Sequence, residues 1–322
     1  MEIDQVTVFG GSGFIGRHLV QELATRGYRI KIAVRSPQRA KYLLPLGDVG
    51  QINPVFCDIL NEESVSEALE NSTIAINLVG ILSKRGKSTF QSIHLESLER
   101  LAKEAGKSRV STFVHISSLG ATSSSPSEYQ KSKAMGEDSL KQCFPNATIL
   151  RPSLIFGHED GFLCRFASLA QVLPGLPLFG DSVFKCGSTL YQPVFIGDVV
   201  KSIICCLEDN STKGKTYEIG GPKVYSYKEL MQMILNVTGK RRLLFPLPNQ
   251  NAYPIAFFCE LLPSFLFGSL FTRDQIKQLN IDNVVNKNAL QLHNLGINST
   301  PLESVISEIL RRFIRESSNE TA

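Results

Sequence analysis

The sequence lacks the cysteine and histidine spacings that bind metals or pair into disulfide frameworks. Its seven cysteines are odd in number, and none of them forms a C-x-x-C pair or a zinc pattern. This indicates small buried side chains in a reducing compartment. The five histidines are scattered along the chain, so we expect no metal site.

Charge is also scarce. Lys and Arg number 34 and Asp and Glu 30, which gives a net charge of +4 on 322 residues, and no Lys/Arg run exceeds three. A nucleic-acid-binding protein is therefore not expected. With 43% hydrophobic residues the chain is too apolar to be disordered, and its length suits one large domain or a medium domain with a smaller partner. Because an apolar strand begins at residue 5, we expect no signal or transit peptide.

Short apolar strands alternate with amphipathic helices over the first half of the chain. Strands are expected at 5–9, 29–34, 53–57, 73–79, 112–116 and 147–151, and helices at 14–26, 62–70, 90–106 and 127–142. This alternation predicts an α/β fold with a Rossmann-type doubly wound parallel sheet.

The alternation loosens after about residue 155. Helices are expected at 197–208, 227–237 and 302–315, short strands at 190–195 and 216–219, and Pro-rich connections at Pro174, Pro177, Pro246 and Pro248. We expect one domain over 1–155 and a smaller, mainly helical C-terminal domain over 156–322. The chain should return to the first domain around 190–208.

Three glycines separate the first strand from the first helix. The segment Gly10-Gly11-Ser12-Gly13-Phe14-Ile15-Gly16 has the spacing G-x-x-G-x-x-G. Gly10 permits a tight turn, Gly13 allows the backbone to approach a pyrophosphate, and Gly16 allows the helix to pack closely on the strand. Free N–H groups at the helix start attract phosphates. The segment therefore predicts that 1–155 is a dinucleotide-binding domain.

The end of the second strand indicates which dinucleotide is bound. An NAD-binding protein would carry an acidic residue there, for the ribose 2′-OH, but this chain carries Arg35, with Arg39 four residues later. A guanidinium pairs with a 2′-phosphate, so we predict NADP(H); the alternative is a solvated surface arginine. Asp58 follows the third strand and is placed to accept from the adenine amino group, or it is an N-cap or turn aspartate.

A tyrosine, a lysine and a serine complete the expected site. Tyr129 and Lys133 lie one helical turn apart, and Ser118 follows the preceding strand. A nearby ammonium lowers the pKa of a phenol, and a serine hydroxyl orients a carbonyl for hydride transfer. We therefore predict Ser118, Tyr129 and Lys133 as catalytic residues. The predicted cofactor-binding residues are Gly10, Ser12, Gly13, Phe14, Ile15, Gly16, Arg35, Asp58, Ile59, Leu78, Val79, Gly80, Tyr129, Lys133 and Pro152.

These residues resemble the pattern of extended or atypical short-chain dehydrogenases/reductases, of the NAD-dependent epimerase/dehydratase type. Further segments resemble the nucleotide-binding accessory subunit of respiratory complex I (NADH:ubiquinone oxidoreductase), the alpha-subcomplex subunit nine family, and its bacterial relatives. They are 76–82, 128–137, 151–162, 191–199 and 272–285, and the resemblance covers nearly the whole chain. It implies tightly held NADPH, a structural or assembly role, and a C-terminal part that faces the complex and the membrane. It also implies a peripheral position on a bacterial inner membrane from the cytoplasm, or on the matrix side of the mitochondrial one.

Two segments bear on whether catalysis survives. Extended members usually carry Asn on the fourth helix, where this chain has His94. We expect His94 to be a helix residue bonded to a backbone carbonyl. The basic loop 84–87 lies near the expected nicotinamide end and either meets an anionic group or is a solvated turn.

The most apolar stretch, 252–271, has 20 residues, one charge (Glu260) and 5 of the 19 phenylalanines. Pro254, Pro263, Gly268 and Glu260 argue against a transmembrane span, so two short amphipathic helices broken at Pro263 are expected. The stretch either covers its own domain or docks on a membrane or hydrophobic partner. The surrounding region 240–277 carries five basic and two acidic residues, which suits an anionic membrane or an acidic partner.

Three functions therefore remain open from the sequence. The leading one is an NADP(H)-binding accessory subunit with a largely structural cofactor. The alternatives are a free-standing NADP(H)-dependent oxidoreductase, epimerase or dehydratase acting on a nucleotide sugar or a small carbonyl compound, and a redox-sensing regulator whose partner binding depends on the cofactor.

Overall fold

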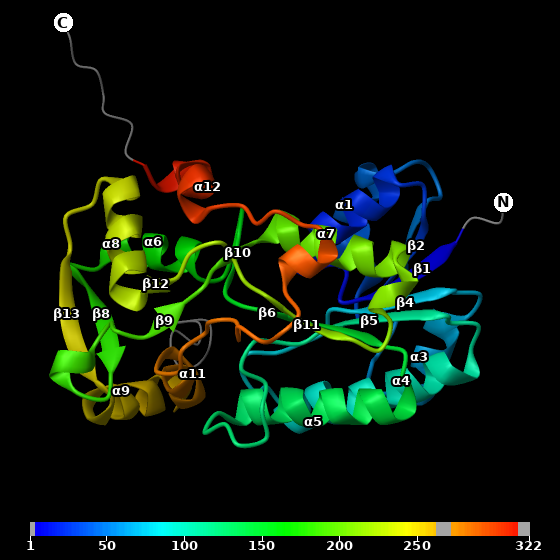
Figure 1. Ribbon diagram of the computed structural model, residues 1–322, viewed down its shortest axis with the longest axis horizontal. Coiled ribbons are helices and arrows are strands. Elements are labelled where there is room, and N and C mark those ends of the chain that lie inside the picture. Colours follow the sequence, from blue (N-terminus) through cyan, green and yellow to red (C-terminus); the bar gives the residue numbers. More distant parts are fainter. Residues whose placement is uncertain (1–3, 262–271, 315–322) are drawn as a thin grey trace, which may run out of the picture. The chain divides into compact units, whose positions relative to one another are not determined.

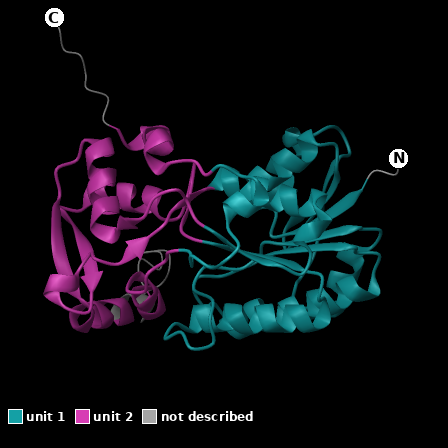
Figure 2. Ribbon diagram, in the orientation of Figure 1, with its two compact units in different colours: residues 1–152, 196–219, 285–298 teal, residues 153–195, 220–284, 299–322 magenta. Residues whose placement is uncertain are grey.

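The computed structural model describes residues 4–261 and 272–314. By its internal contacts the chain divides into two compact units (Figure 2). Unit 1 comprises residues 1–152, 196–219 and 285–298, and unit 2 comprises 153–195, 220–284 and 299–322. The chain thus leaves unit 1 and re-enters it twice; the second return, at 285–298, was not predicted.

Unit 1 is built on a parallel sheet of seven strands in the order β11-β6-β5-β4-β1-β2-β3 (Figure 1). The strands are β1 (Gln5–Phe9), β2 (Arg29–Val34), β3 (Ile52–Phe56), β4 (Ile74–Asn77), β5 (Thr112–Ile116), β6 (Thr148–Pro152) and β11 (Thr216–Ile219). The order 3-2-1-4-5-6 is that of a doubly wound dinucleotide-binding sheet, which confirms the predicted fold class.

Helices cover both faces of this sheet. On one face α1 (Phe14–Thr25) packs against α7 (Ile196–Glu208), and on the other α3 (Glu62–Leu69), α4 (Ser97–Lys107) and α5 (Glu128–Cys143) lie side by side (Figure 1). Short helical elements complete the unit. They are α2 (Pro37–Ala40), η1 (Lys41–Leu46), the π-helical turn η2 (Gln91–Glu96), η4 (Asn210–Thr212) and η5 (Leu292–Leu295). The helix expected over 90–106 is therefore a π-turn continued by an α-helix.

Local sequence explains where these elements begin. Strands β1, β4 and β5 consist largely of buried apolar residues because helices cover both sides of the sheet. Asn61 caps α3 by accepting from the Ser64 N–H, and Ser127 caps α5 by accepting from the Gln130 N–H.

Unit 2 contains five described helices and three pairs of short strands. The helices are α6 (Leu163–Val172), α8 (Tyr227–Thr238), α9 (Asn249–Leu261), α11 (Arg273–Leu279) and α12 (Leu302–Ile309), with short turns η3 (Val183–Lys185) and η6 (Arg311–Phe313). The strands are β7 (Ile155–Phe156), β8 (Gly175–Gly180), β9 (Leu190–Tyr191), β10 (Val194–Phe195), β12 (Tyr225–Ser226) and β13 (Leu243–Pro248). Its core is one cluster centred on the fully buried Tyr227.

Two expectations for this half were wrong. The Pro-rich segments expected as connections form β8 and β13, which pair in parallel from Gly175↔Leu243 to Gly180↔Pro248. Proline is tolerated in a strand of a two-stranded sheet because one edge needs no N–H donor. The 302–315 helix ends at Ile309.

The apolar stretch is only partly described. α9 runs through Pro254 to Leu261, and the break expected at Pro263 lies outside the described residues. Among the helices that the structure describes, none is long and apolar enough to cross a bilayer.

Candidate functional site

The loop between β1 and α1 has the geometry of a phosphate-binding turn. Gly10 has φ +78°, a conformation that favours glycine, and the Gly13 N–H donates to the Gly10 carbonyl at 3.0 Å. A Cβ on Gly10 would lie 3.3 Å from the backbone of Leu78 and Val79. Helix α1 starts directly after Gly13, so its first N–H groups are available to an anion.

Gly16 allows the first turn of α1 to pack closely on the loop that precedes it. A Cβ on Gly16 would lie 2.3 Å from the Gly11 carbonyl oxygen, so the first turn of α1 packs against the loop itself. The approach of the helix to the strand at Gly16 stays a prediction.

A cavity of about 530 Å³ opens at the carboxyl ends of β1, β2, β3 and β4. Seven of the predicted cofactor-binding residues line it: Gly10, Ser12, Arg35, Asp58, Ile59, Val79 and Gly80. The others do not line it: Gly13, Phe14, Ile15, Gly16, Leu78, Tyr129, Lys133 and Pro152. Nine lining residues were not predicted: Phe9, Ala33, Val34, Ser36, Cys57, Leu60, Ile81, Ser88 and Ile93. Six of them directly adjoin predicted residues, whereas Ala33, Ser88 and Ile93 carried no such signal in the sequence.

Two guanidinium groups belong to this cavity. Arg35 follows the last residue of β2, Arg39 lies on α2, and both are exposed. Among the described residues neither forms an ion pair with a carboxylate. The glycine floor and two cations fit a dinucleotide that carries several phosphate groups.

Asp58 shapes a turn at the cavity wall. Its Oδ1 accepts from the Leu60 N–H at 3.0 Å, and its own N–H donates to Ser64 Oγ at 3.0 Å. The turn interpretation of Asp58 is therefore confirmed, while its contact with an adenine stays a prediction.

Lys133 lies behind the cavity wall. Its side chain is buried, and Nζ donates to the Ile116 carbonyl at the end of β5, at 3.2 Å. A Cβ on Gly80 would lie 3.3 Å from this Nζ, so the glycine leaves room for the lysine directly behind the cavity lining. Burial lowers the pKa of Lys133 to about 8.

Tyr129 and Ser118 lie near these groups. The half-buried Tyr129 ring stands edge-on to His94, with centroids 5.2 Å apart, and to Phe90 at 5.9 Å. Ser118 follows Ile116 by two residues, and its buried Oγ has no hydrogen-bond partner among the described residues. An unpaired buried hydroxyl is costly and is common where a ligand supplies the partner.

His94 is bonded differently from our expectation. Its Nε2 accepts from the Ile81 N–H at 3.1 Å, so the backbone partner is an amide and not a carbonyl. Nδ1 therefore carries the proton and donates to Ser132 Oγ at 2.8 Å, and Ser132 in turn donates to the Tyr129 carbonyl at 2.7 Å. Burial lowers the pKa of His94 to about 3, so the ring is neutral at physiological pH.

The basic loop forms a tight turn. Arg85 and Ser88 exchange backbone hydrogen bonds of 3.0 Å around Gly86, which has φ +56°. Lys84 pairs with Glu128 and lies over the Phe90 ring, 5.5 Å from its centroid. Within the described ranges, no cluster of three or more histidine, cysteine or acidic residues could hold a metal ion.

Comparison with known proteins agrees with a dinucleotide-binding fold. The NAD dependent epimerase/dehydratase family model matches residues 6–220. The chain is 32% identical over 308 residues to the mitochondrial NADH dehydrogenase (ubiquinone) 1 alpha subcomplex subunit 9 of Dictyostelium discoideum, covering 95% of this chain and 84% of the relative. It is 33% identical over 307 residues to the Mus musculus protein of the same name, covering 95% and 79%.

A solved structure is similar in fold. The dTDP-glucose 4,6-dehydratase DesIV of Streptomyces venezuelae, with NAD and TYD bound, superposes with a TM-score of 0.69 at 18% identity, over 95% of this chain and 96% of that one. At that identity only the fold is shared. The cofactor class indicated by the family and by the cavity is a nicotinamide dinucleotide. The family match and the two relatives together show that this chain belongs to the NAD-dependent epimerase/dehydratase family and, within it, to the family of complex I alpha subcomplex subunit 9.

Proposed function

We propose that the protein binds NADP(H) in the glycine-lined cavity of unit 1 and holds it mainly as a structural cofactor. Arg35 and Arg39 determine the preference for NADP(H) over NAD(H), because both line the cavity at the end of β2. A carboxylate at that place would accept from the ribose 2′-OH of NAD, whereas guanidinium groups bind a 2′-phosphate bidentately.

Titration of the purified full chain with NADPH and NADH tests this proposal. Arg35→Ala removes charge-assisted hydrogen bonds worth about 1.5–3 kcal/mol, so NADPH should bind roughly 10- to 100-fold more weakly while NADH affinity changes little. Arg29→Ala is the matched control, since Arg29 is exposed at the opposite end of the same strand. Equal affinities for the two cofactors, unaffected by Arg35→Ala, would refute the assignment.

The neutral His94 supports a structural cofactor. Both of its ring nitrogens are bonded within the protein, and the ring holds Ile81 of the cavity wall in place. Because burial lowers its pKa to about 3, the His94 ring takes up no proton near neutral pH. The measurement is the exchange of labelled NADPH into the protein as isolated: a structural cofactor exchanges over hours, and exchange within seconds would contradict this role.

We also propose that region 240–277 docks on a complex-I-type assembly at a respiratory membrane. The named relatives are subunits of that enzyme. Exposed apolar side chains on β13 and α9 lie in this region: Leu243 (77% exposed), Phe245 (43%), Ile255 (53%) and Phe257 (43%). Arg241 and Arg273 are exposed cations of the same region, and the Arg273 guanidinium lies 5.2 Å from the Phe257 ring centroid.

The expected location is peripheral, on the cytoplasmic side of a bacterial inner membrane or on the matrix side in a mitochondrion. Co-purification with complex I tests the docking, and flotation with vesicles of anionic or neutral lipid tests the membrane contribution. Arg241→Glu should reduce retention, and retention by neither complex I nor anionic vesicles would remove the proposal.

A second candidate is a free-standing NADP(H)-dependent oxidoreductase, epimerase or dehydratase. The unpaired Oγ of Ser118 favours it, because a substrate oxygen could satisfy that hydroxyl. The bound nicotinamide would supply hydride transfer. A screen of nucleotide sugars and small carbonyl compounds by NADPH absorbance decides the matter: Tyr129→Phe should reduce genuine turnover by about 10²- to 10⁴-fold.

A further inference from the structure

Two side chains of α5 attach the helix to consecutive residues at the end of β5. Lys133 donates to the Ile116 carbonyl at 3.2 Å, and Glu137, one turn later, accepts from Ser117 Oγ at 2.5 Å. The next residue along the strand end is Ser118. The position of Ser118 and the position of Lys133 therefore both depend on how α5 is fixed to this strand end.

The Glu137 carboxylate is almost fully buried, at 1% exposure. Besides Ser117 it binds Arg151 of β6 in a fork: Arg151 Nε lies 2.9 Å from Oε1, and Nη2 lies 2.6 Å from Oε2. Bidentate pairs of this kind fix geometry as well as charge.

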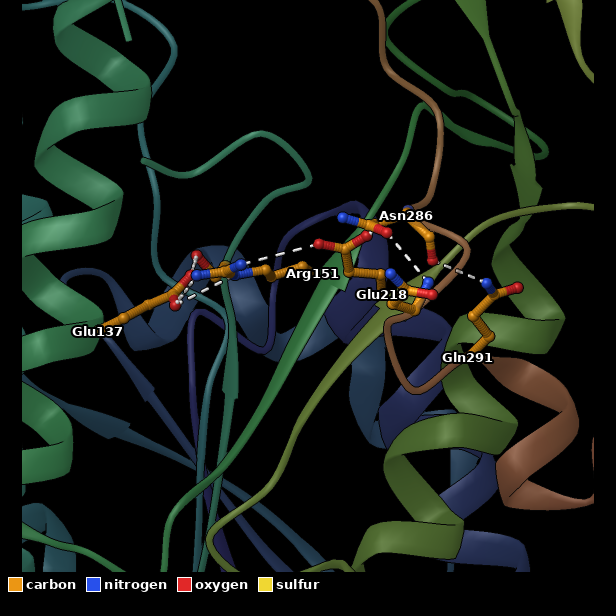
Figure 3. Close-up of polar contacts among 7 residues, drawn as sticks. Glu137, Arg151, Glu218, Asn286 and Gln291 are labelled. Carbon is orange, nitrogen blue, oxygen red and sulfur yellow. Dashed lines mark hydrogen bonds and ion pairs between the residues drawn. The ribbon is translucent and has the colours of Figure 1, made fainter. Parts of the chain in front are cut away.

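The far side of Arg151 reaches the second return of the chain (Figure 3). Its Nη1 lies 3.7 Å from Glu218 Oε1 on β11, and Glu218 Oε2 accepts from the Asn286 N–H at 2.7 Å. Gln291 donates to the Asn286 carbonyl at 3.0 Å. Glu137 is thus the inner end of a polar chain that crosses β6 and β11 to residues 285–298.

Glu137 also acts on the charge of Lys133. The titratable groups that interact with this lysine are His94 from η2 and His115 from β5. Tyr129 lies one turn earlier on the same helix, and Arg151 lies beyond Glu137. Burial lowers the pKa of both histidines, so they are neutral. Burial also lowers the pKa of Lys133, and the Glu137 carboxylate opposes that shift.

We propose that Glu137 is a positioning residue of the cofactor site: its buried carboxylate, held by Arg151, fixes the strand end that carries Ser118 against the helix that carries Lys133. The same carboxylate favours the ammonium form of Lys133, which is the stronger donor to a ribose hydroxyl, so this proposal rests on the cofactor binding proposed above. Glu137 does not line the cavity and acts through Ser117 and Lys133.

The first test measures NADPH affinity between about pH 6.5 and 9.5, a range that brackets the pKa of Lys133. In the unaltered protein, affinity should fall as pH rises through about 8. In Glu137→Gln this fall should move down by roughly one to three pH units, so that binding at about pH 8 weakens about five-fold or more. Glu104→Gln is the matched control, because Glu104 is also buried but pairs with the surface residue Lys107 at 2.6 Å. It should leave the profile in place.

The second test needs no cofactor. Between the folded pKa of Lys133, about 8, and its unfolded value of about 10.4, the unfolded chain binds more protons, so stability rises with pH. The difference from Lys133→Met isolates this rise, which should begin at lower pH in Glu137→Gln. If Glu137→Gln does not fold, Glu218→Gln should shift both profiles the same way by less, because it too makes the surroundings of Lys133 more positive.

The outcomes separate the two proposals. Unchanged pH profiles in the glutamine variants, by both tests, overturn the role of Glu137. Failure of the unaltered protein to bind NADPH at any pH overturns the proposed function, and the cofactor-free test still decides for or against Glu137.

Discussion

At Gly136 the addition of a single methyl group should have a large effect on stability. It lies on α5 where that helix packs on η2, and a Cβ built on it would lie 2.0 Å from the His94 carbonyl oxygen. Because carbon and oxygen approach no closer than about 3.3 Å in such contacts, Gly136→Ala requires α5 and η2 to separate by more than about 1 Å.

The expected cost of this separation is about 3 kcal/mol, at the upper end of overpacking substitutions. For a unit of this size, that lowers the thermal midpoint by about 6–12 °C. Since α5 carries Lys133 and Tyr129 and η2 carries His94, cofactor affinity should fall as well.

Differential scanning calorimetry of the full chain measures the midpoint. Gly106→Ala on the neighbouring α4 is the matched control, because its Cβ would meet nothing closer than the Cys143 carbonyl oxygen at 3.9 Å. That substitution should stabilise the protein by about 0.4–1 kcal/mol, through the lower entropy of the unfolded chain. A Gly136→Ala midpoint equal to that of the unaltered protein would show that the packing argument is wrong.

Three further predictions concern stability. Arg151→Met leaves Glu137 buried without its cation and should cost about 3–5 kcal/mol, whereas the double variant with Glu137→Leu should recover much of this in urea unfolding. The folded pKa of His94, about 3, lies below its unfolded value of about 6.5, so its contribution to stability is lost as pH falls from 6.5 towards 3. His94→Asn should therefore make the acid limb of a pH–stability curve shallower, with His115 still contributing, and an unchanged limb would contradict this. Asn61→Ala removes the cap of α3 and should cost about 1 kcal/mol by thermal unfolding, and a loss below a few tenths would mean that the cap is dispensable.

The parts of the fold that depend on local pattern could be predicted from the sequence. The alternation of apolar strands with helices predicted six strands of the sheet to within two residues at every end, and the glycine spacing placed the turn at Gly10. Tyr129 and Lys133 were predicted on one helix because a spacing of four residues is a property of the helix itself.

The parts that depend on distant contacts could not. The pairing of β8 with β13 was not predicted. Pro246 and Pro248 normally indicate a loop, because proline has no N–H to donate within a sheet, and the sequence does not show that the strand has an edge where no donor is needed. The Glu137–Arg151 pair joins residues 14 apart on different elements, and no periodicity marks it. For His94, a hydrogen bond to the backbone could be predicted from the residue type. Whether the ring meets a carbonyl or an N–H depends on the path of the backbone at Ile81, which the sequence does not show.

The division of unit 1 into three chain segments has a consequence for biosynthesis. Strand β6 pairs with β5 at once but gains its second neighbour only when β11 has been made, and the hydrogen bond from Asn286 to Glu218 forms later still. At about 5–20 residues per second, the stretch from residue 152 to residue 219 takes roughly 3–13 s to translate, and during that time β6 is an open sheet edge. In a protein truncated at the apparent end of the first domain, β6 would remain an exposed sheet edge permanently. Aggregation of residues 1–155 on expression would therefore reflect the absence of the later segments that complete unit 1. It would say nothing against the stability of the complete protein.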